Sequence, residues 1–290
     1  MLHTLIKYTN MLIGIAGRIG HGKDEVARIW QYLDWLRNKG KLEELVDNNI
    51  ISDKDDYSYA EFCKILSNWK LSSLPSYISV IDKVAETVKV IACLILNCKR
   101  EDLESQEFKS SYLSEYNMTV REFLQKLGTD AVRHNLHEDV WINTVMSRYE
   151  KHKKLHQGYE LTPMIISDVR FPNEANAVRS RNGVLIRVCR YEYKLIEHKD
   201  SNGDHTVSHS WKENGDDGVC GYYNDECYDK DASFKSFHEH YLSCTKGYIH
   251  ESERALDDYK FDYTIDNSGS IDELVLKVLE IYKEVNKQSK

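Results

Sequence analysis

The feature that most constrains this chain is a glycine-rich turn between an apolar run and an amphipathic segment. Residues 17–24 read Gly-Arg-Ile-Gly-His-Gly-Lys-Asp, a G-x-x-x-x-G-K pattern, after the apolar run at 11–16 and before helical spacing that begins at Lys23. Such a strand, turn and helix aim backbone N–H groups, a helix N-terminus and a lysine at one point. The sequence therefore predicts a phosphate-binding loop for a nucleoside triphosphate. The alternative is a turn that binds nothing.

The residue after the lysine is Asp24, where Ser or Thr is usual and supplies a hydroxyl to Mg2+. Because Mg2+ prefers oxygen ligands and keeps part of its hydration shell, a carboxylate can hold it directly or through water. The pattern thus predicts a nucleoside triphosphate site with Mg2+ at Asp24. The residues expected to contact the nucleotide are Gly17, Gly20, His21, Gly22, Lys23, Asp24 and Glu25.

Length and composition predict an ordinary globular protein. The 290 residues are 41% hydrophobic and hold 3 prolines, enough for one elaborated domain or two small ones. No apolar stretch reaches the 18 or so residues of a membrane span, so no membrane partner is expected. The net charge of -8 argues against a protein that coats nucleic acid polymers, although a local cationic pocket remains compatible with it.

The 7 cysteines form no C-x-x-C pair and favour a reducing, cytoplasmic location. A zinc site built from Cys220, Cys227, Cys244 and nearby histidines is the weaker alternative, because no close pair has the usual C-x2-4-C spacing.

Strand and helix signals alternate along the chain. Strands are predicted at 162–168, 184–189 and 261–265. Helices are predicted up to Gly40, from near Asp82, from a capping box at Thr119–Glu122 to Gly128, at 139–149, at 173–181 and after Ser270. This order predicts an α/β fold, a three-layer sandwich with a parallel sheet and ligand at the strands' carboxyl ends.

The domain prediction divides the chain into three parts. Residues 1–190 form a core with a helical insertion at 41–76 and acceptor-binding helices at 82–150, residues 191–249 form an inserted lid-like lobe, and residues 250–290 complete the core. The lobe is expected because apolar periodicity is weak there.

Three groups of polar residues are candidates for phosphoryl transfer, which needs positive charge, a metal and alignment. They are Arg121, Gln125 and Arg133; Asp168, Arg170 and Asn173; and Arg187, Arg190 and Arg254. Arg121 and Gln125 share a helix face, and Asp168 ends a buried strand. The alternatives are surface salt bridges for the arginines and a helix cap for Asp168.

The motifs at 17–24, 119–130, 166–174 and 252–267 together resemble the deoxynucleoside monophosphate kinases of bacteriophages and large DNA viruses, a P-loop family. The string Ser-Asp-Val-Arg-Phe-Pro-Asn-Glu at 167–174 is the most specific of the four. The resemblance implies transfer of the ATP γ-phosphate to a deoxynucleoside monophosphate, giving ADP and the diphosphate for DNA precursor supply, in host-cell cytoplasm if the chain is viral.

The resemblance also implies residue roles. Lys23, Asp168 and Arg170 would be catalytic, Asp24 and Asp168 would serve Mg2+, and Arg190 would contact ATP. The substrate would be bound by Lys83, Arg121, Gln125, Thr129, Arg133, Arg170 and Glu253.

Two departures and two rival functions accompany this prediction. Glu25 stands where the family often has Thr, and residues 80–85 resemble the family's acceptor-site segment only loosely, which leaves base selectivity open. The rivals are a kinase of another small acceptor and an ATP-binding regulatory protein without turnover. The sequence leaves open a homodimer and the role of the lobe.

Overall fold

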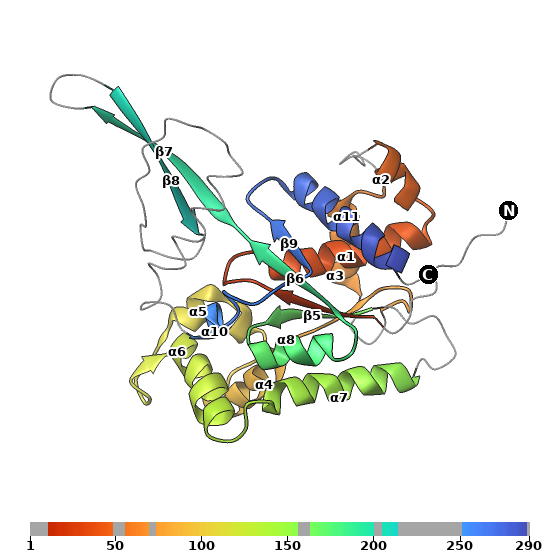
Figure 1. Cartoon of the computed structure of the whole chain (residues 1–290). Helices are drawn as coiled ribbons and strands as arrows, with labels where there is room; N and C mark the ends of the chain where they lie inside the picture. The colour runs from red at the N-terminus through yellow and green to blue at the C-terminus, as the bar shows by residue number, and fades with distance from the viewer. Residues whose placement is uncertain are drawn as a thin grey trace.

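A five-stranded parallel sheet forms the centre of the protein (Figure 1). The computed structural model describes residues 11–48, 56–69, 74–155, 163–199, 205–213 and 251–288. The sheet order is β2-β5-β1-β6-β9, and each neighbouring pair runs parallel. The strands are β1 (Leu12–Ala16), β2 (Val80–Asp82), β5 (Met164–Val169), β6 (Val184–Cys189) and β9 (Tyr263–Asp266). The predicted α/β class is confirmed.

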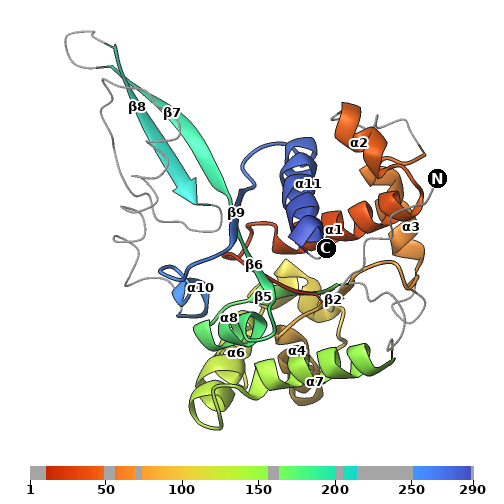
Figure 2. The same cartoon turned by 45° about the vertical axis from the view of Figure 1, so that its right-hand side comes forward.

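Alternate residues of the buried strands pack into two separate hydrophobic cores, because successive side chains of a strand point to opposite faces of the sheet. Ile13, Ile15 and Ile165 pack in one core with α1 (Lys23–Asn38) and α11 (Ile271–Gln288). Leu12 and Ile166 pack in the other. That second core includes side chains of α4 (Ala85–Leu96), α7 (Val140–Leu155) and α8 (Pro172–Arg179). Helices therefore cover both faces of the sheet (Figure 2).

The insertion between α1 and the second strand holds two helices, α2 (Leu42–Asn48) and α3 (Tyr59–Asn68). Phe62 of α3 is fully buried and its ring lies 5.7 Å from that of Tyr32 and 5.6 Å from that of Trp35. Both helices lie within the range predicted for the insertion, residues 41–76.

The region between α4 and α7 holds η2 (Asp102–Glu104), α5 (Gln106–Ser110), the hairpin β3 (Tyr112–Leu113) and β4 (Met118–Thr119), α6 (Val120–Gln125) and the π-helix η3 (Lys126–His134). The capping box at Thr119 and Glu122 is present as predicted. The prediction that Gly128 ends a helix is wrong, since η3 continues through it. Gly128 lacks the left-handed φ of a C-cap, whereas Gly40, with φ 69°, has it just past α1.

Strand β2 was not predicted, because it has only three residues. Its pairing with β5 uses up Val80–Asp82, so α4 begins at Ala85, slightly later than the predicted start near Asp82. The predicted helices at 139–149 and 173–181 correspond to α7 and α8. The predicted cap of α11 is also present, since Ser270 Oγ accepts a hydrogen bond from Glu273 N at 3.3 Å.

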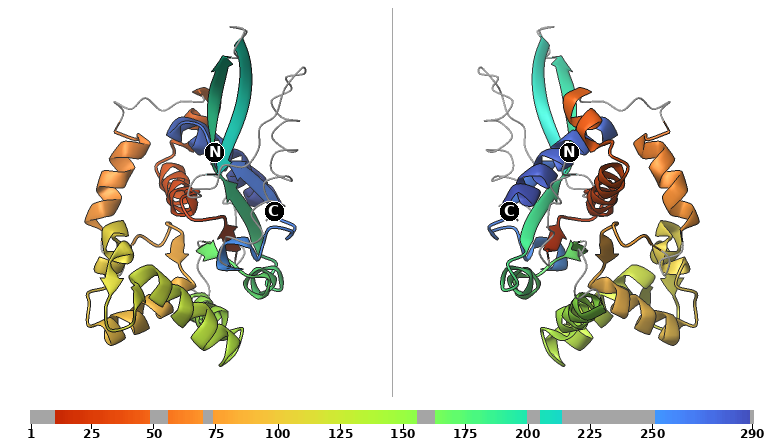
Figure 3. Two further views of the ribbon diagram at one scale, coloured as in Figure 1. Left: turned by 90° about the vertical axis from the view of Figure 1, so that its left-hand side faces the viewer. Right: turned by 90° about the vertical axis from the view of Figure 1, so that its right-hand side faces the viewer.

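A two-stranded antiparallel ribbon follows β6 (Figure 3). It consists of β7 (Tyr191–Lys199) and β8 (His205–Glu213), paired from Tyr191 with Glu213 to Lys199 with His205, and it projects away from α6 and α7. The rest of the predicted lobe, with Cys220, Cys227 and Cys244, lies outside the described residues. Among the helices of the described residues, none combines the length and apolarity needed to cross a bilayer.

Candidate active site

The strand order itself gathers the predicted site. Because parallel strands end at the same edge, the segments after β2, β5 and β1 become neighbours in that order. Lys83 follows β2, Arg170 follows β5, and the glycine-rich loop follows β1. Their meeting at one edge is therefore a property of the sheet.

The loop has the backbone that phosphate binding requires. Gly20 and Gly22 have φ values of 82° and 89°, in the region that favours glycine. Lys23 opens α1 and its Nζ donates to the carbonyl oxygens of Gly17 at 2.5 Å and Arg18 at 2.7 Å. Burial lowers the pKa of Lys23 to about 8, and Arg170 contributes, while nearby carboxylates oppose the shift. A bound polyphosphate would restore the charge of this ammonium.

The segment that follows β9 is hydrogen-bonded to the glycine-rich loop. Asn267 Nδ2 donates to the carbonyl of His21 at 2.9 Å, and a Cβ on Gly22 would lie 2.3 Å from that same Nδ2. His21 Nδ1 donates to the carbonyl of Val188 in β6 at 2.9 Å. His21 therefore anchors the loop to the sheet and points away from the cleft.

Asp24 and Ser167 supply oxygen atoms beside the lysine. Ser167 Oγ donates to Asp24 Oδ1 at 2.8 Å, and Lys83 Nζ lies 2.7 Å from Asp24 Oδ2. The Asp24 side chain is 57% exposed. Burial favours the protonated form of Asp24, but the contacts with Lys83 and Ser167 outweigh it and hold the pKa of Asp24 below its usual value. An exposed carboxylate next to a hydroxyl fits Mg2+, which takes oxygen ligands and retains waters.

Asp168 is a helix cap in this structure. Its Oδ1 accepts from Val84 N at 2.6 Å and its Oδ2 accepts from Ala85 N at 2.9 Å, at the start of α4. The residue is only 7% exposed, and burial raises the pKa of its carboxyl despite these bonds. Asp168 therefore fixes α4 against the end of β5, and Asp24 is the more accessible carboxylate for a metal.

Glu253 joins the loop to Arg170. Its Oε2 accepts from the backbone N–H of Ile19 at 2.7 Å, and its Oε1 pairs with the guanidinium of Arg170. Glu253 lies on the short helix α10 (Glu251–Arg254), so this contact crosses between distant parts of the chain. Burial acts against ionisation here, yet Arg170 and Lys23 lower the pKa of Glu253. The carboxylate is therefore charged at neutral pH.

The two terminal nitrogens of the Arg133 guanidinium are hydrogen-bonded, and its face lies against an aromatic ring. Its guanidinium donates to the carbonyl of Glu138 at 3.0 Å and to Asn173 Oδ1 at 2.9 Å, pairs with Glu174, and lies 3.6 Å from the ring centre of Phe171. Only 5% of Arg133 is exposed. The residue thus ties η3 to the start of α8, and its substrate role remains a prediction.

A cleft of about 470 Å³ brings most of the predicted residues together. The predicted residues that line it are Gly20, Gly22, Lys23, Asp24, Lys83, Arg121, Gln125, Thr129, Arg133, Asp168, Arg170 and Glu253. Four residues predicted to contact the nucleotide, Gly17 among them, do not line it. His21 borders a small cavity behind the loop, the Glu25 carboxylate contacts Arg28 and Tyr59 at 2.7 Å each, and Arg190 is exposed after β6.

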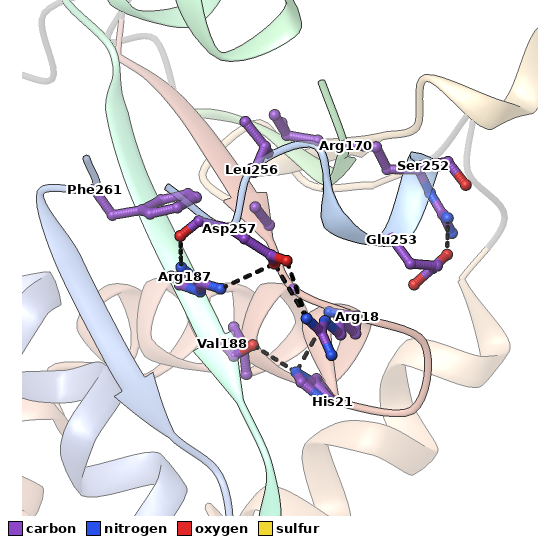
Figure 4. Close-up of a pocket in the computed structure, with 13 residues that line it drawn as sticks. Arg18, His21, Arg170, Arg187, Val188, Ser252, Glu253, Leu256, Asp257 and Phe261 are labelled. Carbon is purple, nitrogen blue, oxygen red and sulfur yellow. Dashed lines mark hydrogen bonds and ion pairs between the residues drawn. The ribbon is translucent and has the colours of Figure 1, made fainter. Parts of the chain in front are cut away.

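The small cavity behind the loop is organised by Asp257 (Figure 4). Gly17 borders it, and the Asp257 carboxylate lies between Arg18 of the loop, at 3.1 Å, and Arg187 of β6, at 3.5 Å. Figure 4 also shows Glu253 of α10 paired with Arg170, which follows β5. This ion cluster supports the loop from the side opposite the cleft.

Sequence reasoning missed several residues of the cleft: Ser167, Lys89, Glu104, Gln106, Lys109 and Trp141. Ser167 stands beside Asp168 in the most specific string, which was a usable signal. Lys89 lies in the mostly apolar run at 85–96 and Lys109 in the charged stretch at 99–109, and no motif marks either lysine as a ligand.

Residues 76–209 match the model of the deoxynucleotide monophosphate kinase family. Over this segment the chain is similar to that family. The match includes the helix pair at 119–130 and the string at 167–174, whereas the loop at 17–24 and the motif at 252–267 lie outside it. A comparison with curated proteins found no match. The match supports deoxynucleotide monophosphate kinase activity, a phosphotransferase reaction that uses ATP, and it confirms the resemblance over the matched residues.

Proposed function

We propose that the protein transfers the γ-phosphate of ATP, with Mg2+, to a deoxynucleoside monophosphate in the supply of DNA precursors. The observation that carries the proposal is the single cleft in which Lys23 and Asp24 of the loop face basic residues of α4 and α6. Phosphoryl transfer needs little more than alignment and charge stabilisation, and this cleft supplies both.

Each residue type fits one task. Lys23 neutralises the ATP phosphates, and Arg170 stabilises negative charge on the transferred group. Asp24, with Ser167, would hold Mg2+, which screens the phosphate charges when bound. Asp168 would assist indirectly by positioning the start of α4. No general base is required, because the acceptor phosphate is already anionic near neutral pH.

The experiment is ADP release from ATP and Mg2+ with a panel of deoxy- and ribonucleoside monophosphates. Lys23→Ala is the test variant, and Lys126→Ala, on the exposed face of η3, is the matched control. Turnover that requires a deoxynucleotide and is lost only in Lys23→Ala supports the proposal. Turnover on another acceptor favours the first rival, and ATP binding without turnover favours the regulatory one.

The remaining predictions on organisation belong to the same proposal. We propose a core of residues 1–190 and 250–290 with a lid-like lobe at 191–249, a cytoplasmic location, and a homodimer as the state to test by light scattering. Removal of the lobe with retention of turnover would contradict the lid role.

A further inference from the structure

Three basic side chains from separate elements converge on one wall of the cleft. Lys89 comes from α4, Lys109 from α5 and Arg121 from α6, and all three line the cavity. Neither Lys89 nor Lys109 belongs to the recognised motifs. Because three elements contribute to the cluster, it is a product of the tertiary structure.

Glu104 and Gln106 organise these cations. Lys89 Nζ lies 2.8 Å from Glu104 Oε1, and Lys109 Nζ donates to the Glu104 carbonyl at 3.5 Å. Arg121 donates to Gln106 Oε1 at 2.7 Å. The Lys89 side chain is only 13% exposed, so its ammonium group is restricted to the position beside Glu104. The wall is therefore preorganised.

The wall carries more positive than negative charge. Among the described residues that line it, Glu104 is the one carboxylate, and it also pairs with Arg100 at 2.6 Å. Burial lowers the pKa of Lys109, Lys89 lowers it further, and Glu104 offsets this only in part. Burial acts against Glu104 as well, yet Lys89 and Arg100 hold its pKa at about 2. An anion placed between these cations would relieve their repulsion.

The other two arginines that line the cleft, Arg133 and Arg170, already pair with carboxylates. The Arg133 guanidinium is paired with Glu174, and that of Arg170 with Glu253. A phosphate that bound at either arginine would have to compete with a carboxylate. At the α4–α6 wall, a phosphate meets two lysines and an arginine that share one carboxylate.

We infer that Lys89, Lys109 and Arg121 bind the phosphate of the acceptor and that Lys89 and Lys109 select phosphorylated over unphosphorylated nucleosides. The ligand class is a phosphate monoester dianion, whose charge matches the surplus of the wall. This assignment rests on the proposed function. It makes Lys89 and Lys109 specificity-determining residues that act on substrate binding and leave the ATP site unaltered.

The test is equilibrium binding by calorimetry without ATP. The probes are the four deoxynucleoside monophosphates, the deoxynucleoside of the best binder, and ADP. Lys89→Gln/Lys109→Gln is the test variant, Lys89→Arg is the variant that keeps the positive charge, and Lys126→Gln is an exposed control. Thermal unfolding verifies that each variant is folded.

The expected result is monophosphate binding about tenfold weaker or more in the double variant, since charged hydrogen bonds contribute about 1.5–3 kcal/mol each. Binding of the deoxynucleoside and of ADP stays unchanged, and Lys89→Arg retains most of the affinity. Unchanged monophosphate affinity in the folded double variant overturns the inference, as does an equal loss for ADP.

The two proposals fail separately. If ATP-dependent turnover occurs and the double variant binds the monophosphate normally, the inference is wrong and the kinase proposal stands. If the double variant binds the monophosphate weakly and no turnover occurs, the inference stands and the kinase proposal is wrong. Absence of binding of any monophosphate to the unaltered protein overturns this inference.

Discussion

Asn267 and His21 are separated by most of the chain, yet the Asn267 side-chain amide donates to the His21 carbonyl at 2.9 Å. The bond exists because β9 lies beside β6, which lies beside β1, so the segment after β9 reaches the loop after β1. The loop is thereby fixed by a residue outside its own motif. This contact leads to the first prediction.

Replacement of Asn267 by Ala should weaken ATP binding. A hydrogen bond of this kind contributes about 0.5–1.5 kcal/mol, so the KM for ATP should rise by about two- to tenfold. Initial rates at varied ATP check this, with Asn143→Ala on the exposed face of α7 as control. An unchanged KM would show that the loop holds its shape without this amide.

Replacement of Asp168 by Asn should destabilise the protein. An amide has one acceptor oxygen, so either Val84 N or Ala85 N loses its partner at the start of α4. The expected loss is about 1–3 kcal/mol of the free energy of unfolding. Urea unfolding measures it, and Asp130→Asn on the exposed side of η3 is the control. Equal midpoints for the two variants would argue against the capping role.

The binding of ADP should weaken as pH rises through about 8, where Lys23 loses its proton. Lys23→Arg should keep binding at pH 9, because guanidinium remains charged. The folded pKa lies below the unfolded one, so the unfolded state binds more protons between pH 8 and 10.5 and Lys23 makes stability rise with pH in that window. A decline of equal steepness in Lys23→Arg would assign the titration to another group.

Replacement of Glu174 by Gln should be strongly destabilising, because it leaves the buried guanidinium of Arg133 without its counter-ion. Loss of one partner of a buried pair costs about 3–5 kcal/mol. The double variant Arg133→Met/Glu174→Gln should recover part of this loss, which chemical denaturation measures as a coupling energy. Strict additivity of the two single effects would contradict direct coupling.

Replacement of Glu25 by Gln should leave the KM for ATP within about twofold, although the sequence placed Glu25 among the nucleotide ligands. Its carboxylate contacts Arg28 and Tyr59, and a partly exposed pair contributes about 0–1 kcal/mol. Asp24→Asn, one residue earlier, should instead lower turnover and raise the Mg2+ requirement. A large KM effect of Glu25→Gln would restore its predicted role.

Local sequence determined the parts of this protein that depend on near neighbours. The apolar runs of β1 and β5, the helix stop at Gly40, the capping box at Thr119 and the loop at 17–24 are each specified within a few residues, since caps, glycine turns and side-chain periodicity act over that range. These signals were enough for the α/β class and for Lys23 and Asp24.

Tertiary structure decided the rest, because contacts between distant residues leave no local pattern. The strand β2 exists through its pairing with β5, and the helix passes Gly128 because backbone bonding continues as η3. Only the sheet order brings Asn267 to His21, and only packing turns Lys89 and Lys109 from ordinary surface lysines into one wall of the cleft. The electrostatic effect of a charged side chain depends on which groups lie within a few ångströms of it, and sequence spacing does not record those distances.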